Sequence, residues 1–513
     1  IMNKHTPKIV AHLLPTFGNI LWIAAFFGVL LRGRQMINAD GDLLLHLNLG
    51  KYILDTGKIP LRDVFSHTLT GQPVTQHEWL SALIFELINR VFGLEGIVFL
   101  CALVIGTTIH FVVKNVHNQS RALLPALLAV LLTLINSMVH WMARPHIFTF
   151  LLLILWISVL NQMRAGHLKR WWALPALMLF WANLHGGFIV GFITLAIYGF
   201  GLGFDVLFHR LNEEEKLASH FWLYYLLGGI TSFLASLLNP SGIGLWVKVV
   251  GHAGNQYLAS ITNEFQPPNF HEVTYWPFLL TIGLLVIVLG FSKKKYKAEL
   301  LFNSAFWLML GLYSCRNIPL FAIVAAPILA LGLADLLLNA NLDIKFSAWI
   351  KGLDSRLQVL DGQLKGVFWP ILSILIAVLG LSLGLHFDID GEGYAFDPEV
   401  FPIEAVDWLE ANPQEGEMFN YFTWGGYLQY RLWPEKRVFI DSKSDFYGED
   451  FVRQYGQVIA QQDGWEDVLK QYNVDWAILP IDEPAAKAIQ RDLGWEIVYQ
   501  DNTTAILRKQ FTP

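Results

Sequence analysis

Long apolar segments, separated by short polar ones, fill the chain from its start to about residue 385. Eleven of these segments are close to the roughly 17–25 residues that a helix needs to cross a bilayer. They lie near 13–31, 94–113, 122–141, 147–163, 171–184, 187–208, 221–238, 276–292, 299–315, 319–338 and 367–385. A shorter stretch at 79–92 is interrupted by Glu86 and Asn89, and we expect it to be an interfacial or re-entrant helix. The pattern therefore predicts about 11 transmembrane helices, with the chain termini on opposite sides of the membrane.

The composition agrees with this interpretation and excludes other classes of protein. Of the 513 residues, 54% are hydrophobic and only 15% are charged, whereas a soluble chain carries roughly 25% charged residues. The net charge of -6 offers no basic patch for nucleic acid. Cys101 and Cys315 both lie in apolar segments, so they form no disulfide framework or zinc site. No small-residue cleavage site follows the first apolar segment, which favours an uncleaved first helix over a signal peptide.

The distribution of lysine and arginine predicts the orientation, because loops rich in these residues stay in the cytoplasm. With the N-terminus in the cytoplasm, five basic clusters fall on that side. They are 114–121, 164–170, 210–216, 293–297 and 345–365. We therefore expect a multi-pass protein of the plasma (inner) membrane, in contact with membrane lipids, whose C-terminal domain is extracytoplasmic.

Residues 388–513 form a second unit, which is polar and distinct from the transmembrane domain at 1–387. Helix-like stretches at 402–410, 450–462, 465–472 and 485–493 alternate with strand-like ones at 417–421, 437–441, 475–479, 496–499 and 504–507. This alternation predicts a small α/β domain with a largely parallel sheet.

Two motifs of this second unit invite a functional interpretation. Trp424-Gly425-Gly426-Tyr427 lacks the full glycine spacing of a nucleotide-binding loop, so a tight strand-to-helix turn is favoured. The sequence 441–445 (Asp-Ser-Lys-Ser-Asp) follows a predicted strand, where α/β folds place ligand contacts. Aspartate and serine also favour turns and helix caps, and that alternative stays open.

Polar and ionisable residues gather in five loops that share the extracytoplasmic side in this topology. The longest is the first outer loop, within 32–93. The candidate residues are Asp40, Asp42, His46, His77, Glu78, Arg144, His146, His185, Glu264 and Arg316. Ionisable residues at the membrane are functional candidates by default. Because the topology places these loops on one face, we interpret the residues as one site.

The acidic residues of the first outer loop suit acid–base or metal chemistry. Asp42 and His46 are four residues apart, so they share one face if a helix begins near Asp40. A carboxylate and a histidine in this relation can position a general base or hold a divalent cation. An aspartate before an apolar helix is also a common N-cap. Glu264 could reach the same acids from a later loop.

The arginines and the remaining histidines suit binding of an anionic substrate. Arg144 and Arg316 each stand at the outer start of a predicted span, and arginine binds phosphate through two parallel hydrogen bonds. Lipid headgroup phosphate is the alternative ligand. His185, in a turn with two glycines, contacts either a ligand or its own turn, and His77 precedes an amphipathic stretch whose interfacial placement would also explain it.

The layout resembles the GT-C glycosyltransferases, which include protein O-mannosyltransferases, the lipid A aminoarabinose transferase and oligosaccharyltransferase catalytic subunits. The resemblance covers about 13–340 in layout, and its sharpest features are the Asp40-Gly41-Asp42 pair after one span, Gly57-Lys58-Ile59-Pro60, and a short helix after His77 that ends in Phe92-Gly93. The family often has Asp-Glu or a lone Asp in place of the acidic pair, and His-Pro-Pro in place of His77-Glu78-Trp79. A Trp-Trp-Asp signature is absent, so asparagine glycosylation is not expected.

The resemblance implies a GT-C-like fold and transfer of a sugar from a polyprenyl-phosphate donor to a protein, lipid or glycan acceptor. Asp40, Asp42 and Glu78 would be catalytic, and Asp40 or Asp42 would act on the acceptor hydroxyl with inversion. His46, His77, Arg144, His146, His185, Glu264 and Arg316 would bind substrate. A divalent cation, Mg²⁺ or Mn²⁺, could bind Asp42, His46 and Glu264 without being required. The alternative is a non-catalytic subunit of a membrane complex; a transporter would need internal repeats, which we do not find.

Overall fold

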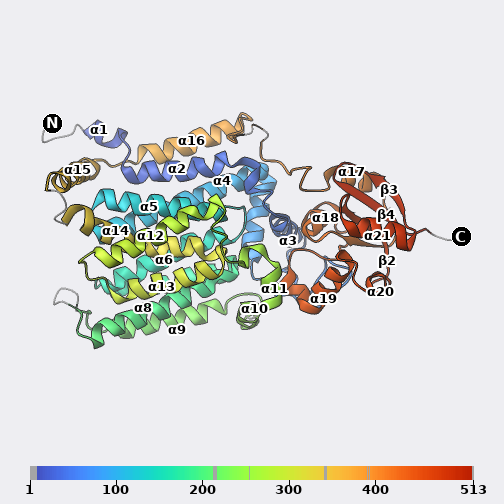
Figure 1. Ribbon diagram of the computed structural model, residues 1–513, viewed down its shortest axis with the longest axis horizontal. Helices are drawn as coiled ribbons and strands as arrows, with labels where there is room; N and C mark the ends of the chain where they lie inside the picture. The colour runs from blue at the N-terminus through green and yellow to red at the C-terminus, as the bar shows by residue number, and fades with distance from the viewer. Residues whose placement is uncertain are drawn as a thin grey trace.

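The structure of the protein is a computed structural model, which describes residues 8–211, 216–253, 255–339, 344–389, 391 and 393–510. Figure 1 shows a bundle of roughly antiparallel helices followed, along the longest axis, by a smaller domain that contains the C-terminus. The first helix, α1, lies at the end of the bundle that is far from the C-terminal domain.

The bundle consists of long helices joined by short turns. In chain order, the helices are α1 (Lys8–Leu13), α2 (Phe17–Leu31), α3 (Asp42–Thr56), α4 (Trp79–Ser120), α5 (Leu123–Ser137), α6 (His146–Arg164), α7 (Ala173–Leu184), α8 (Ile189–Leu207), α9 (Phe221–Ser236), α10 (Gly244–Ala253), α11 (Gln256–Ile261), α12 (Trp276–Phe291), α13 (Ala298–Tyr313), α14 (Ile318–Ala334), α15 (Ile344–Gln363) and α16 (Phe368–Ser382). Short 3-10 turns that matter for the site are η2 (Met138–His140), η4 (Gly186–Phe188), η6 (Asn263–Phe265) and η8 (Cys315–Asn317).

Each of the predicted apolar segments lies in a helical part of the bundle. Seven helices in the described residues are long and apolar enough to cross a membrane, or up to eight if α15 and α16, bent by 70°, count as one span. Two shorter apolar helices are α9 and α13. The predicted fold class, a polytopic α-helical membrane protein with a C-terminal α/β domain, is confirmed.

The short helix predicted at 79–92 continues into the next apolar segment. Together they form α4, which is broken at Gly93, where φ is +66° and ψ is -165°. Residues with a side chain rarely adopt this left-handed φ, so a glycine permits the break.

The C-terminal domain has three layers, with helices on both faces of a four-stranded sheet. Its elements are α17 (Ile403–Ala411), β1 (Glu417–Asn420), α18 (Gly425–Leu432), α19 (Ser444–Ile459), α20 (Trp465–Gln471), β2 (Val474–Pro480), α21 (Pro484–Leu493), β3 (Glu496–Gln500) and β4 (Thr504–Arg508). Alternate residues of β2 face opposite layers: Trp476 and Ile478 pack with α17 and α18, whereas Ala477 and Leu479 pack with α19, α20 and α21.

Two expectations for this domain were wrong. The strand order is β1-β2-β4-β3, and only β1 and β2 are parallel, so the sheet is mixed rather than largely parallel. The segment 437–441 forms no strand of this sheet, and Val438 makes only an isolated bridge with Ser66. The side chain of Asn420 replaces a neighbouring strand, because its Oδ1 accepts from the amides of Phe439 and Ile440 and its Nδ2 donates to the carbonyl of Ile440.

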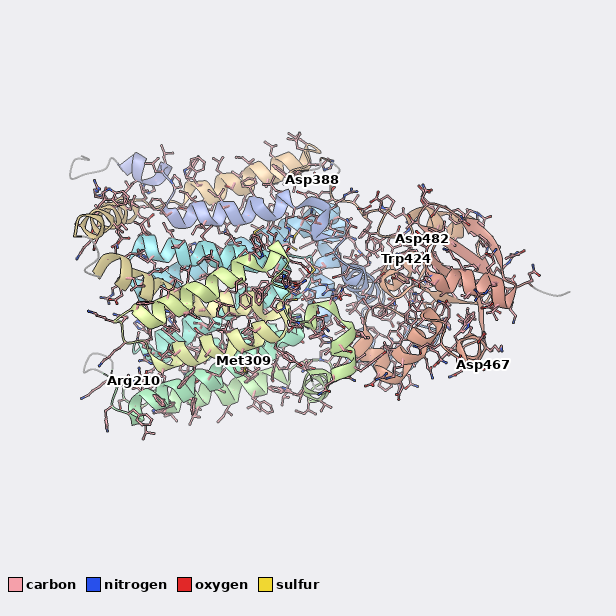
Figure 2. All side chains as sticks on the ribbon, in the orientation of Figure 1. Arg210, Met309, Asp388, Trp424, Asp467 and Asp482 are labelled. Carbon is pink, nitrogen blue, oxygen red and sulfur yellow. The ribbon has the colours of Figure 1, made fainter. Side chains whose placement is uncertain are left out.

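The first outer loop joins the bundle to the C-terminal domain. The amide of His67 donates to the carbonyl of Val438 over 3.0 Å, and the amide of Val438 donates to the carbonyl of Phe65 over 3.1 Å. Leu44 of α3 and Leu258 of α11 are buried among side chains of the two faces of the C-terminal sheet. The end of the bundle where the candidate residues lie is therefore closed by this domain, and Figure 2 shows Trp424 at the junction.

Candidate functional site

Arg144 is the centre of one half of the site. It lies in the turn between η2 and α6. Its guanidinium pairs with Asp40 through two nitrogens, Nε at 3.0 Å from Oδ1 and Nη2 with Oδ2. Nη2 also lies 2.7 Å from Asp42 Oδ2, and Nη1 lies 3.2 Å from Glu264 Oε2. Three carboxylates from two distant loops thus converge on one guanidinium, an arrangement that we call the Arg144 cluster.

The start of α3 holds the two aspartates in place. Asp42 is the first residue of the helix, and its amide donates to Asp40 Oδ1 over 3.0 Å. Gly41 stands between them and abuts the C-terminal domain so closely that a Cβ there would lie 2.4 Å from the carbonyl oxygen of Thr423. A Cβ at Gly426 would lie 2.4 Å from the carbonyl oxygen of Gly41. The Trp-Gly-Gly-Tyr motif therefore provides close packing. Asp40 accepts the first amide of the helix, and both aspartates bind Arg144.

Arg316 extends the Arg144 cluster on the side of Glu264. Its Nη1 lies 3.4 Å from Glu264 Oε1, and its guanidinium stacks over the ring of Phe265 at 4.6 Å. Burial would raise the pKa of Glu264, but the charges of Arg316 and Arg144 outweigh burial and lower this pKa. Burial likewise opposes the charge of Arg144, but its three carboxylates raise its pKa. In the same cluster, burial and the charge of Asp42 raise the pKa of Asp40 to about 6, although Arg144 opposes this. Glu264 and Arg144 are therefore ionised at neutral pH.

Glu78 is the centre of the other half, which we call the Glu78 cluster. Three imidazoles surround its carboxylate, with Nε2 of His185, His46 and His77 at 3.5, 3.6 and 3.7 Å. Glu78 precedes α4 but its side chain makes no capping hydrogen bond. Within the described residues, its carboxylate has neither a hydrogen bond nor a lysine or arginine in salt-bridge contact.

The hydrogen bonds of His185 determine which of its two ring nitrogens carries the proton. Nδ1 of His185 accepts from the amide of Gly187 over 3.1 Å and lies 2.8 Å from the hydroxyl of Thr149. Because an amide can only donate, Nδ1 carries no proton, and the neutral ring carries its proton on Nε2, which points to Glu78.

Burial shifts the pKa of each group in this cluster towards its neutral form. It raises the pKa of Glu78 from its usual 4.5 to about 7, with help from Asp42 and Asp445. It lowers the pKa of His77 to about 3 and those of His46 and His185 well below 6.5. At neutral pH the cluster is therefore a carboxyl group that is ready to exchange a proton among uncharged imidazoles.

A chain of contacts connects the two clusters, so the structure brings all ten predicted residues together. His140 Nε2 lies 3.7 Å from Glu264 Oε2, and its ring lies 4.2 Å from that of His146. The ring of His146 in turn lies 6.4 Å from that of His185. Glu264 does not contact the first-loop acids directly but meets them through Arg144.

The predicted cation ligands do not converge as a set. Asp42 and Glu264 both bind Arg144, while His46 faces Glu78. Across the described part of the chain, no group of three His, Cys, Asp or Glu side chains is arranged to hold a metal ion. We derive no step through a cation, and metal dependence stays a prediction.

Several residues of the site were not predicted, and most come from the junction with the C-terminal domain. The hydroxyl of Ser442 donates to Asp42 Oδ1, and Lys248 Nζ of α10 lies 2.8 Å from Asp445 Oδ2. The motif at 441–445 was noted in the sequence, but nothing there indicated its partners. His140 and Thr149 lie beside predicted residues and carried no signal of their own.

Comparisons with known proteins leave the family open. No family model matches the chain, and no curated protein matches it. The fold is similar to two crystal structures of ArnT from Cupriavidus metallidurans. One, bound to undecaprenyl phosphate, has a TM-score of 0.47 and 12% identity and covers 96% of this chain and 97% of that one. The other, in the apo state, has a TM-score of 0.48 and 13% identity and covers 95% and 97%. Similarity at this level assigns neither a family nor an activity, so the GT-C resemblance rests on the sequence motifs.

Proposed function

We propose that the protein is a glycosyltransferase that moves a sugar from a polyprenyl-phosphate donor to an acceptor hydroxyl at the membrane surface. One observation carries the proposal. At one end of an apolar helical bundle, a cluster with two arginines suited to phosphate is connected through histidines to a carboxyl group, Glu78, whose pKa is about 7. The polyprenyl chain of such a donor needs an apolar surface along the bundle, and its phosphate needs cations at the end of the bundle.

The chemistry assigns a role to each half of the site. Glu78 accepts the proton of the acceptor hydroxyl, whose oxygen forms the new bond to the anomeric carbon. The bond from that carbon to the phosphate oxygen breaks, and Arg316 with Arg144 stabilises the departing polyprenyl phosphate. Asp40 and Asp42 orient Arg144 and the acceptor. Attack opposite the leaving phosphate inverts the anomeric carbon.

A second candidate is a non-catalytic subunit of a membrane complex, which a different observation favours. Each carboxylate of the Arg144 cluster pairs with a guanidinium, and the cluster ties the first outer loop to the loop that contains Glu264. A structural ion cluster would have the same arrangement. In that case the C-terminal domain would serve for docking.

The orientation of the protein in the membrane is part of the same proposal. We place the protein in the inner membrane with the C-terminal domain outside the cytoplasm. Support comes from Arg210, in one of the basic clusters, which Figure 2 shows at the end of the bundle opposite this domain. Basic loops favour the cytoplasmic side.

Transfer from a panel of polyprenyl-phosphate sugars by the purified protein tests the function. We expect transfer by the wild type, and its loss in Glu78→Gln, Asp40→Asn, Asp42→Asn and Arg316→Ala variants that remain folded. A chelator added to the same reaction tests the predicted cation. If the folded wild type neither binds nor consumes any such lipid, the subunit interpretation replaces the enzyme.

A further inference from the structure

Helix α10 presents an apolar stripe that no other part of the described chain covers. Ile243, directly before the helix, and Val247 and Val250 within it are 58%, 70% and 59% exposed. Their spacing of four and three residues puts them on one side of the helix. Branched aliphatic side chains with this exposure need a cover other than water, because each would gain free energy from burial.

The opposite side of α10 is fixed to the bundle. Leu245 is buried, and the ring of Trp246 lies between those of Phe188, Phe192 and Phe233 at 5.2, 5.0 and 5.4 Å. The indole nitrogen of Trp246 donates to the hydroxyl of Ser236 over 2.9 Å. The outward stripe is therefore a fixed feature of the surface.

The stripe continues the apolar surface of the bundle. Leu234 of α9 and Leu238, two residues after its end, are 55% and 66% exposed, and Ile243 follows in the next turn. Figure 1 shows α10 at the end of α9, beside the junction with the C-terminal domain. The lipid that covers α9 would therefore extend to α10.

A third side of α10 reaches the candidate site. Lys248 Nζ lies 2.8 Å from Asp445 Oδ2 and 3.4 Å from the carbonyl oxygen of Thr75, two residues before His77. One helix thus contacts the bundle, the C-terminal domain and the loop that carries Glu78.

We propose that α10 is an interfacial helix whose Ile243, Val247 and Val250 stripe lies in the surface of the bilayer. Its partner is the phospholipid bilayer at the level where headgroups meet acyl chains, as for other amphipathic helices. The ion pair of Lys248 with Asp445 then holds the C-terminal domain against the membrane and keeps the site near headgroup depth. The stripe has no basic side chain, so it needs no anionic lipid. This proposal does not depend on the glycosyltransferase activity.

Fluorescent labelling of single introduced cysteines tests the proposal in nanodiscs of phosphatidylcholine. Cys101 and Cys315 are buried, and the labelled wild type serves as the blank. An environment-sensitive nitrobenzoxadiazole label is attached at Val247→Cys and Val250→Cys. The aqueous control is Lys470→Cys, three residues from Asp467, which Figure 2 shows on the far part of the C-terminal domain. The lipid control is Leu226→Cys in α9, which is 59% exposed.

We expect blue-shifted emission and weak iodide quenching at 247 and 250 relative to Lys470→Cys. Lipids with a nitroxide near the headgroup should quench both labels more strongly than lipids labelled at the chain end, with the reverse order for Leu226→Cys. Adding phosphatidylglycerol to the nanodiscs should change neither the emission nor the quenching of these labels. The proposal is overturned if 247 and 250 match Lys470→Cys in emission and iodide quenching, or if their shift requires phosphatidylglycerol.

Discussion

The two halves of the candidate site differ in how their charges are compensated. In the Arg144 cluster, Asp40, Asp42 and Glu264 each contact a guanidinium. The pKa of Glu264 is lowered, and that of Asp40, which burial raises, reaches only about 6. In the Glu78 cluster, the carboxylate faces uncharged imidazoles 3.5 to 3.7 Å away, and its pKa is raised to about 7. Both clusters lie at the same end of the bundle, so position alone does not explain the difference.

This contrast separates a role in the fold from a role in chemistry. Ionised groups that are partly buried and paired stabilise a structure mainly because removing one partner leaves the other uncompensated. A carboxylate without a compensating charge costs stability when it ionises, and such groups are concentrated at functional sites. We therefore expect substitutions in the Arg144 cluster to affect folding and activity, and substitution of Glu78 to affect activity alone.

The largest effect is expected from Arg144→Met. The substitution leaves three carboxylates without their shared cation, and we expect the free energy of unfolding to fall by roughly 3 kcal/mol. Thermal unfolding in detergent measures this change. Arg491→Met is the matched control, because Arg491 is exposed and, within the described residues, pairs with Asp492 alone, so its loss should change the unfolding temperature little. Equal effects of the two substitutions would contradict a structural role for the Arg144 cluster.

Glu78→Gln should show the opposite pattern. Removing the carboxylate removes a charge without a cationic partner, so the unfolding temperature should stay the same or rise. Transfer should fall roughly 10²- to 10⁴-fold, as expected for loss of a general base. Unfolding curves and initial rates measured on the same preparation check both statements. A large loss of stability would mean that Glu78 supports the fold, and the contrast with Arg144 would disappear.

The pH dependence of transfer tests whether Glu78 is the titrating group, because two of its neighbours shift its pKa in opposite directions. Burial raises its pKa to about 7, Asp445 raises it further, and Lys248 lowers it. Transfer should therefore rise with pH through about 7, as Glu78 loses its proton. Lys248→Met should move this rise to higher pH and Asp445→Asn to lower pH. Shifts of the same sign for both variants would exclude Glu78 as the titrating group.

The same pKa has a consequence for stability. The folded value of about 7 lies above the usual 4.5, so the protonated carboxyl group is favoured in the folded protein. Its contribution to stability is complete below 4.5 and is lost as the pH rises through about 7. In Glu78→Gln, this loss between 4.5 and 7 should be absent from the pH dependence of the unfolding temperature.

The sequence was sufficient to predict the bundle and to group the ten candidate residues at one of its ends, because both follow from patterns that persist in the structure. Apolar segments become helices, and the roughly antiparallel arrangement of these helices brings every second loop to the same end of the bundle (Figure 1). His185 and Arg316 could therefore be grouped with Asp40 without knowledge of any contact. Which of them would touch could not be predicted, since Arg144 and Glu264 are 120 residues apart.

The contacts between the bundle and the C-terminal domain could not be predicted for a different reason. The backbone bonds between Phe65, His67 and Val438 depend on how the domain docks. The wrong strand at 437–441 has its origin within the C-terminal domain. Its apolar sequence is typical of a strand, but one amide side chain, that of Asn420, takes the place of a strand partner. A local sequence pattern does not predict that a side chain will take the place of a neighbouring strand.

The smallest effect is expected at Ser442, where the two domains meet at the Arg144 cluster. Its hydroxyl donates to Asp42 Oδ1 from a loop 400 residues away in the chain. If this bond positions Asp42, Ser442→Ala should lower kcat about tenfold, in line with one lost hydrogen bond to a charged group, while KM stays the same. Ser442→Thr keeps the hydroxyl and should restore most of the rate. Ser444→Ala, two residues later at the first position of α19, is the matched control and should leave the rate unchanged. An equal loss in Ser444→Ala, or no rescue by threonine, would show that the loop contributes packing rather than the position of Asp42. The C-terminal domain would then cover the site without taking part in it.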